Sequence, residues 1–358
     1  AGAEEIKIIG VVPAWIEDLD QLTDDLTRLA QIDPEVVIDE ISNPVVQPDW
    51  FVPVGEVKEV VYLAVGDEIE SIPGVLVRDG TERLSFRTGF AAHLVGTTGP
   101  ITAEQLAGLG FPYGPTDTIG QTGIESAYEK TLAGRPRTAI VRVNKFGRVM
   151  EDLLVVEAVT PEPVRTTIDI DVQTAIEQVL RDDERPLAVV VLEASTGHVL
   201  GTASRPLTSG FDRAISGSYP PGSTFKVVTT TALLEHGYSA STEVECPGRV
   251  TLGGRAIRNA NNRDLGTIDL IEAFAESCNT TFAAATVEDL DASILNDVAE
   301  RFGFDVEPTL GVPSPTATFP EPADIADLAA SAIGQARILV SPVHMASVAG
   351  AVSAGTWR

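Results

Sequence analysis

The sequence predicts an α+β protein with two domains, and three features of the chain support this prediction. The first part of the chain alternates short helical and strand-like segments with many loops. Pro161–Glu162–Pro163 then breaks the pattern, since two prolines in three residues suit neither a helix interior nor a central strand. After the break, Leu187–Leu192 and His198–Ala203 read as a tight antiparallel hairpin, and helices dominate from there on. We therefore expect a mixed domain over residues 1–162, and an antiparallel sheet with helices over residues 163–358.

Hydrophobic periodicity predicts the positions of the individual elements. Helices are expected at Trp15–Ile32, Ala103–Leu109, Ile124–Leu132 and Val172–Arg181, and at residues 225–236, 267–277, 280–287, 293–302, 323–332 and 342–353. Further strands are expected at Glu56–Val65, Val75–Arg83, Arg137–Val143 and Gly147–Val159. The last two flank Asn144–Gly147, which we expect to form a hairpin turn.

Charge and composition argue against several functions. The 358 residues include 52 acidic and 25 basic side chains, which gives a formal net charge of −27. A surface this acidic repels nucleic-acid phosphates and anionic lipid headgroups, so we expect neither as a partner. The four histidines lack the spacing of a helical metal pair, and the two cysteines lack CxxC spacing, so we expect no metal and no other cofactor. The sequence contains no Gly-Lys dipeptide of a phosphate-binding loop and no Gly-x-Ser-x-Gly elbow.

The segment Tyr219–Val228 carries the strongest chemical signal, with the sequence Tyr-Pro-Pro-Gly-Ser-Thr-Phe-Lys-Val-Val. Its prolines and glycine predict that a helix begins at or next to Ser223, and its apolar residues predict that this helix is buried. Ser223 and Lys226 are three positions apart, so their side chains share one helix face. Burial favours the neutral form of a lysine, which can then accept the serine proton and activate the hydroxyl as a nucleophile. The alternative is that Ser223 caps the helix while Lys226 extends to solvent.

Two observations favour the chemical interpretation of this pair. The chain has five lysines, and Ser223 is the only serine followed by a lysine three positions later. Lys226 also lies in an apolar helix, where an unused charge is costly.

A second pattern, Ser277–Cys278–Asn279, is the only Ser-x-Asn in the chain and follows the helix expected at residues 267–277. A hydroxyl and an amide just beyond a helix end can both point into one cleft, where the hydroxyl relays a proton and the amide holds a substrate carbonyl. The alternative is an ordinary helix C-cap with Asn279 in the left-handed conformation.

Taken together, the Ser-x-x-Lys and Ser-x-Asn motifs resemble those of the penicillin-binding proteins, the serine acyltransferases that cross-link peptidoglycan. Other segments resemble this family too: Thr196–Leu200, Ala332–Gln335 with Ser341–Ala346, and Gly123–Gly134, the last of which is similar to the pedestal, or dimerisation, region of the class B subgroup. The resemblance implies a non-catalytic pedestal over residues 1–162 and a penicillin-binding, β-lactamase-like transpeptidase domain over residues 163–358.

The resemblance also implies a role for each site residue. Ser223 would be the acylated nucleophile, Lys226 its general base, Ser277 the proton relay and Asn279 the amide that positions substrate. The implied function is a serine D,D-transpeptidase that joins peptidoglycan stem peptides through an acyl-enzyme and is inhibited by β-lactams. The alternative is a non-catalytic cell-wall scaffold or a β-lactam sensor with the same fold. The implied place is the extracytoplasmic face of the bacterial membrane, with cell-division or elongation proteins as further partners.

The sequence departs from the family in one respect. The third motif, Lys-Thr-Gly, should lie downstream of Ser-x-Asn on a sheet strand, and it is absent. Arg87–Thr88–Gly89 is similar but lies upstream of Ser223, so we interpret it as a turn. We expect the C-terminal strands to lie outside this sequence, as a separate cleaved chain, as a tail beyond Arg358, or as a part removed by truncation. We expect the same of an N-terminal anchor, since the sequence begins at Ala1 rather than Met and contains no membrane span.

The cysteines Cys246 and Cys278 leave two possibilities open. An extracytoplasmic protein permits a disulfide, and both residues belong to the region that shapes the rim of the implied site. The other possibility is a pair of buried thiols, because connectivity cannot be read from a sequence.

Overall fold

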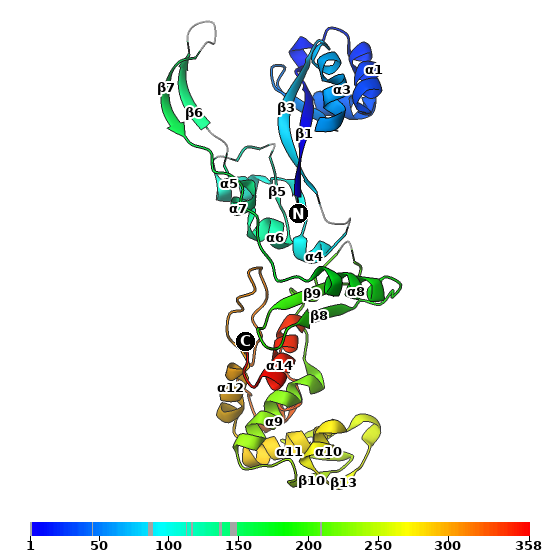
Figure 1. The fold of residues 1–358 in the computed structure, drawn as a ribbon. Coiled ribbons are helices and arrows are strands. Elements are labelled where there is room, and N and C mark those ends of the chain that lie inside the picture. The colour runs from blue at the N-terminus through cyan, green and yellow to red at the C-terminus, as the bar shows by residue number, and fades with distance from the viewer. Residues whose placement is uncertain are drawn as a thin grey trace. The chain divides into compact units, whose positions relative to one another are not determined.

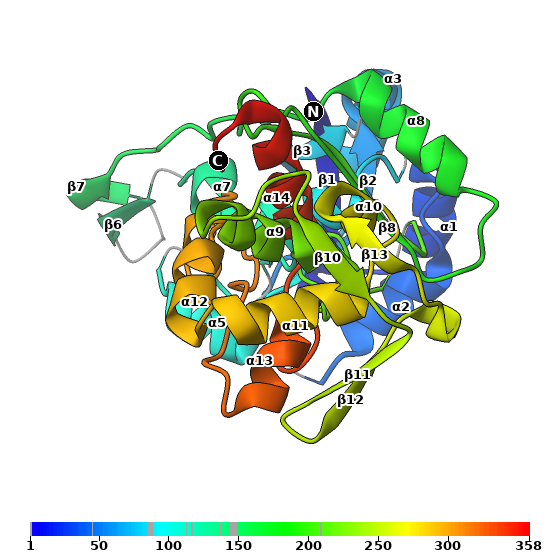
Figure 2. The ribbon, with the colours of Figure 1, turned by 90° about the horizontal axis from the view of Figure 1, so that it is seen from below.

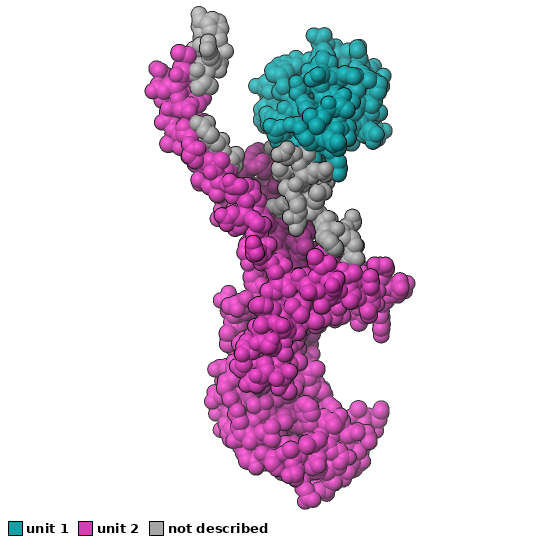
Figure 3. Space-filling view, viewed as in Figure 1, with its two compact units in different colours: residues 1–88 teal, residues 89–358 magenta. Residues whose placement is uncertain are grey.

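The computed structural model describes residues 2–44, 46–84, 89–111, 113–115, 117–135, 138–143, 149–207 and 210–358. The chain divides into two compact units, Ala1–Thr88 and Gly89–Arg358, which Figure 3 colours separately. The domain boundary that we predict between residues 162 and 163 lies inside the second unit and remains a proposal.

The first unit is a three-stranded antiparallel sheet with helices packed against it. Its strands have the order β2-β1-β3. They are β1 (Gly2–Val11), β2 (Val52–Lys58) and β3 (Val75–Leu84), and the helices are α1 (Leu19–Ala30), α2 (Pro34–Ser42) and α3 (Glu59–Glu70). Buried aliphatic side chains of the sheet and helices form one core, which includes Ile9, Leu26 and Ile69.

The strand at Val75–Arg83 is confirmed, but two other predictions for this unit need correction. The segment Glu56–Val65 is extended only to Lys58 and then continues as α3. Its valines favour a strand by local propensity, and the helix forms because its buried residues Gly66 and Ile69 pack on the sheet side. The helix expected at Trp15–Ile32 begins only at Leu19, where the Asp18 carboxylate accepts a hydrogen bond from the backbone N–H of Gln21.

The first part of the second unit is built from short elements. They are α4 (Ala92–Val95), β4 (Thr98–Pro100), α5 (Ala103–Leu109), β5 (Thr118–Gly120), α6 (Gly123–Ala127), α7 (Glu129–Ala133), β6 (Thr138–Val143) and β7 (Val149–Val156). The α5 prediction is confirmed, and Thr102 and Gln105 form a capping box at its start. The single helix expected at Ile124–Leu132 is instead two helices, because the backbone of Tyr128 leaves the helical conformation.

Strands β6 and β7 pair antiparallel, as expected for the segments Arg137–Val143 and Gly147–Val159. The turn that we predict at Asn144–Gly147 lies outside the described residues, as do Arg87 and Thr88 of the Arg-Thr-Gly sequence.

The predicted hairpin of the C-terminal domain is confirmed. Strands β8 (Ala188–Leu192) and β9 (Val199–Ser204) pair antiparallel. Helix α8 (Ile170–Leu180) lies along β9, and helix α14 (Pro342–Ala354) packs against β8 (Figure 1). The hairpin is therefore covered by helices, and β9 is buried over most of its length.

The rest of this unit is a helical cluster. Its helices are α9 (Lys226–Glu235), α10 (Leu270–Ala275), α11 (Asn279–Asp289), α12 (Ala292–Arg301) and α13 (Ile325–Ser331). Helix α11 packs against both α9 and α13, and α9 also packs against α12 (Figure 2). Phe225 is fully buried at the centre, where its ring stacks on that of Phe319 and meets the ring of Phe304 edge-on.

Sequence analysis did not predict four short strands in this cluster. They are β10 (Glu243–Cys246), β11 (Arg249–Leu252), β12 (Arg255–Arg258) and β13 (Gly266–Asp269). Each has four residues and includes charged or polar side chains, so none presents a recognisable apolar run. One consequence is that Thr267 belongs to β13 rather than to the helix expected at 267–277. Helix α10 begins after Asp269, whose carboxylate accepts a hydrogen bond from the N–H of Glu272.

Among the described residues, no helix combines the length and the apolar character needed to cross a membrane. Within the same residues, no three His, Cys, Asp or Glu side chains are grouped so that they could hold a metal ion.

His344 on α14 leads to a first testable prediction. Its ring packs against Phe304, its Nε2 has no hydrogen-bond partner within the described chain, and burial lowers its pKa to about 4. The unfolded chain therefore binds this proton more tightly than the native state, and stability falls as the pH drops from about 6.5 to about 4. We expect His344→Gln to remove up to ~3 kcal/mol of that pH-dependent loss.

The measurement is denaturant unfolding of both proteins across this pH range. The difference between the two curves isolates His344 from the many carboxylates that also titrate. An exposed histidine, replaced as His236→Gln, controls for the general effect of removing an imidazole. Parallel curves for the wild type and His344→Gln would contradict the prediction.

Candidate active site

The segment before α9 presents Ser223 at the surface and buries Lys226. A 3-10 turn, η2 (Gly222–Phe225), follows the two prolines, and the α-helix itself begins at Lys226. The Ser223 side chain is exposed, whereas Phe225 and Lys226 are 0% and 1% exposed. The expected helix start next to Ser223 is confirmed, and the alternative in which Lys226 extends to solvent is wrong.

The Lys226 amine lies at the centre of all the predicted site residues. Its Nζ is 3.3 Å from Ser223 Oγ, 2.9 Å from Ser277 Oγ and 2.6 Å from Asn279 Oδ1. It also donates a hydrogen bond to the backbone carbonyl of Ser277 at 2.7 Å. The structure thus brings together two motifs that are about 50 residues apart in the sequence.

The two carbonyl oxygens around Lys226 determine how the amine is used. Asn279 Oδ1 and the Ser277 carbonyl can only accept hydrogen bonds, so they take two of the amine's protons. In the neutral amine, the remaining position is a lone pair, and the Ser223 and Ser277 hydroxyls lie within its reach. Burial lowers the pKa of Lys226 to about 8, and no carboxylate among the described residues forms an ion pair with it to counter that shift. The lysine can therefore act as a base near neutral pH.

The Ser277–Cys278–Asn279 corner is a tight junction between two helices. Ser277 has a positive φ of 55°, Cys278 caps α11, and Asn279 is the first residue of α11. The alternative in which Asn279 takes the left-handed conformation is wrong, because Ser277 takes it. The turn directs the Ser277 hydroxyl and carbonyl and the Asn279 amide to one point, which is Lys226 Nζ.

The corner is tied to the neighbouring strands by a disulfide and a buried amide. Cys246, at the end of β10, is bonded to Cys278. The Asn259 side chain donates hydrogen bonds to the carbonyls of Pro247 and Arg263 and accepts one from the N–H of Thr280 on α11. These contacts hold the start of α11, and hence Asn279, in a fixed position.

Gly334 is a site residue whose role sequence reasoning missed. Its carbonyl accepts a hydrogen bond from the N–H of Gly222, one residue before Ser223, at 2.8 Å. Gly334 has a φ of +68°, and a Cβ there would lie 2.0 Å from the Gly222 carbonyl oxygen. The resemblance of Ala332–Gln335 to the family points to this segment but gives it no role, and a glycine marks positions where the backbone takes a left-handed conformation or approaches a neighbour closely.

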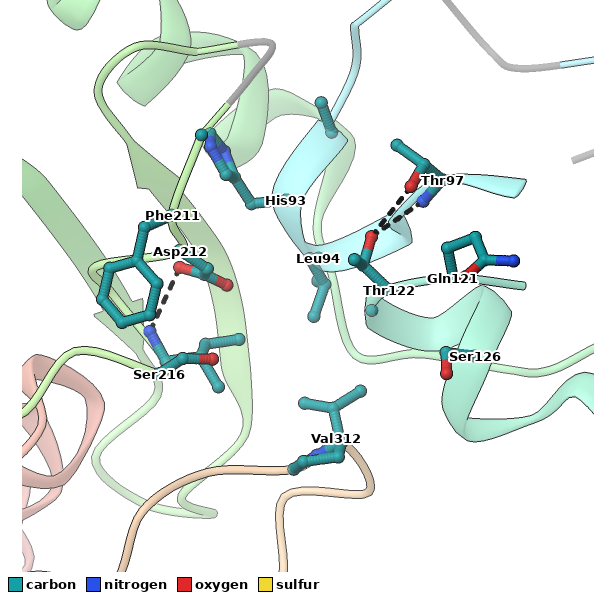
Figure 4. A pocket seen from close by; sticks show the side chains of 15 residues that line it. His93, Leu94, Thr97, Gln121, Thr122, Ser126, Phe211, Asp212, Ser216 and Val312 are labelled. Carbon is teal, nitrogen blue, oxygen red and sulfur yellow. Dashed lines mark hydrogen bonds between the residues drawn. The ribbon is translucent and has the colours of Figure 1, made fainter. Parts of the chain in front are cut away.

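Figure 4 shows a cavity of about 590 Å³ in the second unit. It is lined by α4, by residues around Thr122 and by the loop that contains Asp212. None of the four predicted site residues lines it, so its presence adds nothing to the chemistry of Lys226.

Comparison with known proteins identifies two domains in this chain. Residues 187–357 match the penicillin binding protein transpeptidase domain, and residues 3–166 match the penicillin-binding protein dimerisation domain. The chain belongs to the class B penicillin-binding proteins. The two domain matches occur in the order expected from the sequence, with the Ser-x-x-Lys and Ser-x-Asn motifs in the second.

Curated relatives carry names that agree with this family. The chain is 31% identical over 268 residues to peptidoglycan D,D-transpeptidase PbpA of Mycolicibacterium smegmatis. This match covers 65% of this chain and 53% of PbpA. It is 28% identical over 264 residues to peptidoglycan D,D-transpeptidase MrdA of Escherichia coli. This match covers 65% of this chain and 41% of MrdA. The matched region thus spans about half the length of these relatives.

Solved structures share the fold. The penicillin-binding protein PBP2 from Helicobacter pylori matches with a TM-score of 0.81 and 19% identity, over 99% of this chain and 75% of that one. The same protein in complex with MreC matches with a TM-score of 0.80, over 100% of this chain and 74% of that one.

Proposed function

We propose that this class B penicillin-binding protein is a serine D,D-transpeptidase that cross-links peptidoglycan stem peptides. The observation that carries the proposal is a buried lysine amine within 3.3 Å of an exposed serine hydroxyl, next to a second serine and an amide. The names of the curated relatives support the same activity.

In the first half of the reaction, Ser223 Oγ attacks the penultimate D-alanyl carbonyl of a pentapeptide stem. Its proton passes to the neutral Nζ of Lys226 as the C–O bond forms. The N–H of Ser223 donates to the developing oxyanion, and the positive end of the following helix favours that charge. The amide C–N bond then breaks, the leaving D-alanine amine takes a proton from Lys226 through the Ser277 hydroxyl, and an acyl-enzyme remains.

In the second half, the amine of a neighbouring stem peptide attacks the acyl carbonyl. Its proton leaves by the same route in reverse, the bond between Ser223 Oγ and the acyl carbon breaks, and the serine regains its hydrogen. Asn279 holds Lys226 through its Oδ1, and we assign to its Nδ2, which also donates to the Arg258 carbonyl, the role of orienting the substrate carbonyl. A β-lactam enters the same first step, and its acyl group blocks the second.

The binding partners and the cellular location of the protein follow from the same proposal. The substrates are peptidoglycan stem peptides, so the protein acts on the extracytoplasmic side of the bacterial membrane. β-Lactams are expected covalent inhibitors. The solved complex of a similar fold with MreC supports an elongation protein as a further partner.

Intact mass spectrometry after incubation with benzylpenicillin tests the proposal. We expect the full-length protein to gain one acyl group and to be labelled by a fluorescent penicillin. Ser223→Ala is expected to lose both signals, because no other described hydroxyl combines exposure with contact to Lys226. Ser218→Ala, which removes an exposed hydroxyl from the preceding loop, should be labelled like the wild type. A folded wild-type protein that takes no label would favour a non-catalytic scaffold instead.

A further inference from the structure

Hairpin β11–β12 presents two arginines side by side next to the candidate active site. The strands pair with Arg249 opposite Arg258 and Val250 opposite Ile257. Directly opposed residues in an antiparallel pair point to the same face. Ile257 is buried and Val250 is partly buried against the core, so Arg249 and Arg258 share the outer, exposed face.

Neither guanidinium forms an ion pair in the part of the chain that the structure describes, and the nearby Asp264 carboxylate accepts a hydrogen bond from the N–H of Gly266 instead. Other arginines of this acidic protein form ion pairs, such as Arg263 with Glu276 and Arg301 with Glu235. Like charges directly opposite each other destabilise a pair of strands, and an anion bound between them would relieve this repulsion. An unpaired cationic doublet in a chain of net charge −27 therefore indicates a binding role.

The two arginines line an open groove. The groove has a volume of about 440 Å³ and is completed by Pro247, Gly248, Asn262 and Asp264. Asn262 and its neighbour Asn261 both have positive φ, at 53° and 56°. Asparagine adopts this left-handed conformation more readily than most other residues, and two in succession form a tight turn beside the groove.

The groove is rigidly connected to the catalytic corner. Asn279 donates from its Nδ2 to the backbone carbonyl of Arg258 at 2.9 Å, while its Oδ1 contacts the Lys226 amine. Asn259, the residue after Arg258, is held by the hydrogen bonds to Pro247, Arg263 and Thr280 that are described above. A group bound by the arginines would therefore be held at a fixed position relative to Ser223.

We propose that Arg249 and Arg258 bind an internal carboxylate of the stem peptide, on a residue that precedes the D-Ala-D-Ala bond attacked by Ser223. This inference rests on the proposed transpeptidase function and concerns its substrate specificity. The planar guanidinium forks suit bidentate recognition of a carboxylate. A phosphate-rich polymer is a poorer occupant, because the net charge of −27 repels a polyanion more strongly than it repels a peptide with few carboxylates.

The experiment compares two synthetic D-Ala-D-Ala stem peptides with the full-length protein. One has its internal carboxylates free, and in the other they are carboxamides. We expect the wild type to turn over the acidic peptide with a kcat/KM about 10- to 100-fold higher than that of the amidated peptide. The variant Arg249→Gln/Arg258→Gln should lose this preference and keep its rate of acylation by benzylpenicillin. Thr251→Ala, on the same outer face of the hairpin, should keep the preference.

The outcomes separate the two proposals. If the wild type is not acylated by benzylpenicillin, the transpeptidase function itself fails. If acylation is normal but the double variant still prefers the acidic peptide, the arginine groove is overturned. A parallel loss of acylation and peptide turnover in the double variant would also overturn it. If the double variant does not fold, the single variant Arg249→Gln is tested and interpreted in the same way, because it leaves Arg258, whose backbone carbonyl accepts a hydrogen bond from Asn279, unchanged.

Discussion

Replacing Lys226 with methionine is expected to reduce acylation of Ser223 by benzylpenicillin at least ~10³-fold, with the protein still folded. Methionine has a similar length and fills the same buried space, but it cannot accept the proton of the Ser223 hydroxyl. Among the described residues, the amine is the only basic nitrogen that contacts Ser223 Oγ. The measurement is the second-order rate constant of acylation, taken from stopped-flow or quenched intact-mass time courses.

The folded state should survive this change because two effects oppose each other. Burial lowers the pKa of Lys226 from 10.5 to about 8, so holding the lysine costs about 3 kcal/mol at pH 7. Methionine removes that cost but leaves Asn279 Oδ1 and the Ser277 carbonyl without a donor, at about 1–3 kcal/mol each. We therefore expect a melting temperature within several degrees of the wild-type value, measured by calorimetry.

The pH dependence of the acylation rate constant is a second test of Lys226 as the general base. Acylation requires neutral Lys226, so its rate constant should rise about tenfold per pH unit and level off above about pH 8. Lys226→Arg provides the matched control, since a guanidinium keeps the charge but does not deprotonate in this range. A folded Lys226→Arg protein that acylates at a tenth of the wild-type rate or faster would contradict the base assignment.

The chemistry of the site was predictable because it depends on local spacing. Ser223 and Lys226 lie one turn apart on the chain, so helical geometry alone brings their side chains together. The burial of Lys226 was predictable too, since the residues after it are apolar. Ser277 and Asn279 could be linked to them only through the family resemblance, because no local rule connects residues about 50 positions apart.

The surroundings of the site were not predictable, because they depend on tertiary contacts. Hairpin β11–β12 consists of four-residue strands with exposed arginines, and its position is fixed by Asn259 and by the Cys246–Cys278 disulfide. The same reason accounts for the error at Glu56–Val65. Its valines favour an extended chain locally, and packing on the sheet selects helix α3 instead.

The contact between Gly334 and the nucleophile turn predicts the second large effect. We expect Gly334→Ala to reduce acylation of Ser223 about 100-fold or more and to lower the melting temperature by several degrees. The added Cβ would lie 2.0 Å from the Gly222 carbonyl oxygen and 2.7 Å from Phe225 Cβ. Phe225 is fully buried against Phe319 and Phe304 and cannot retreat, so the turn that carries Ser223 must move.

A matched variant separates this displacement from simple backbone strain. Gly355, which ends α14, has a φ of +72°, close to the +68° of Gly334, but a Cβ there meets nothing within 4 Å. Gly355→Ala therefore carries the same conformational cost of about 1–2 kcal/mol without a clash, and its acylation rate should equal that of the wild type. If both variants lost acylation equally at matched folded fractions, the loss would come from strain in general. A loss confined to Gly334→Ala would mean that Ser223 reacts only when the Gly222–Gly334 hydrogen bond holds its turn against the Lys226 amine.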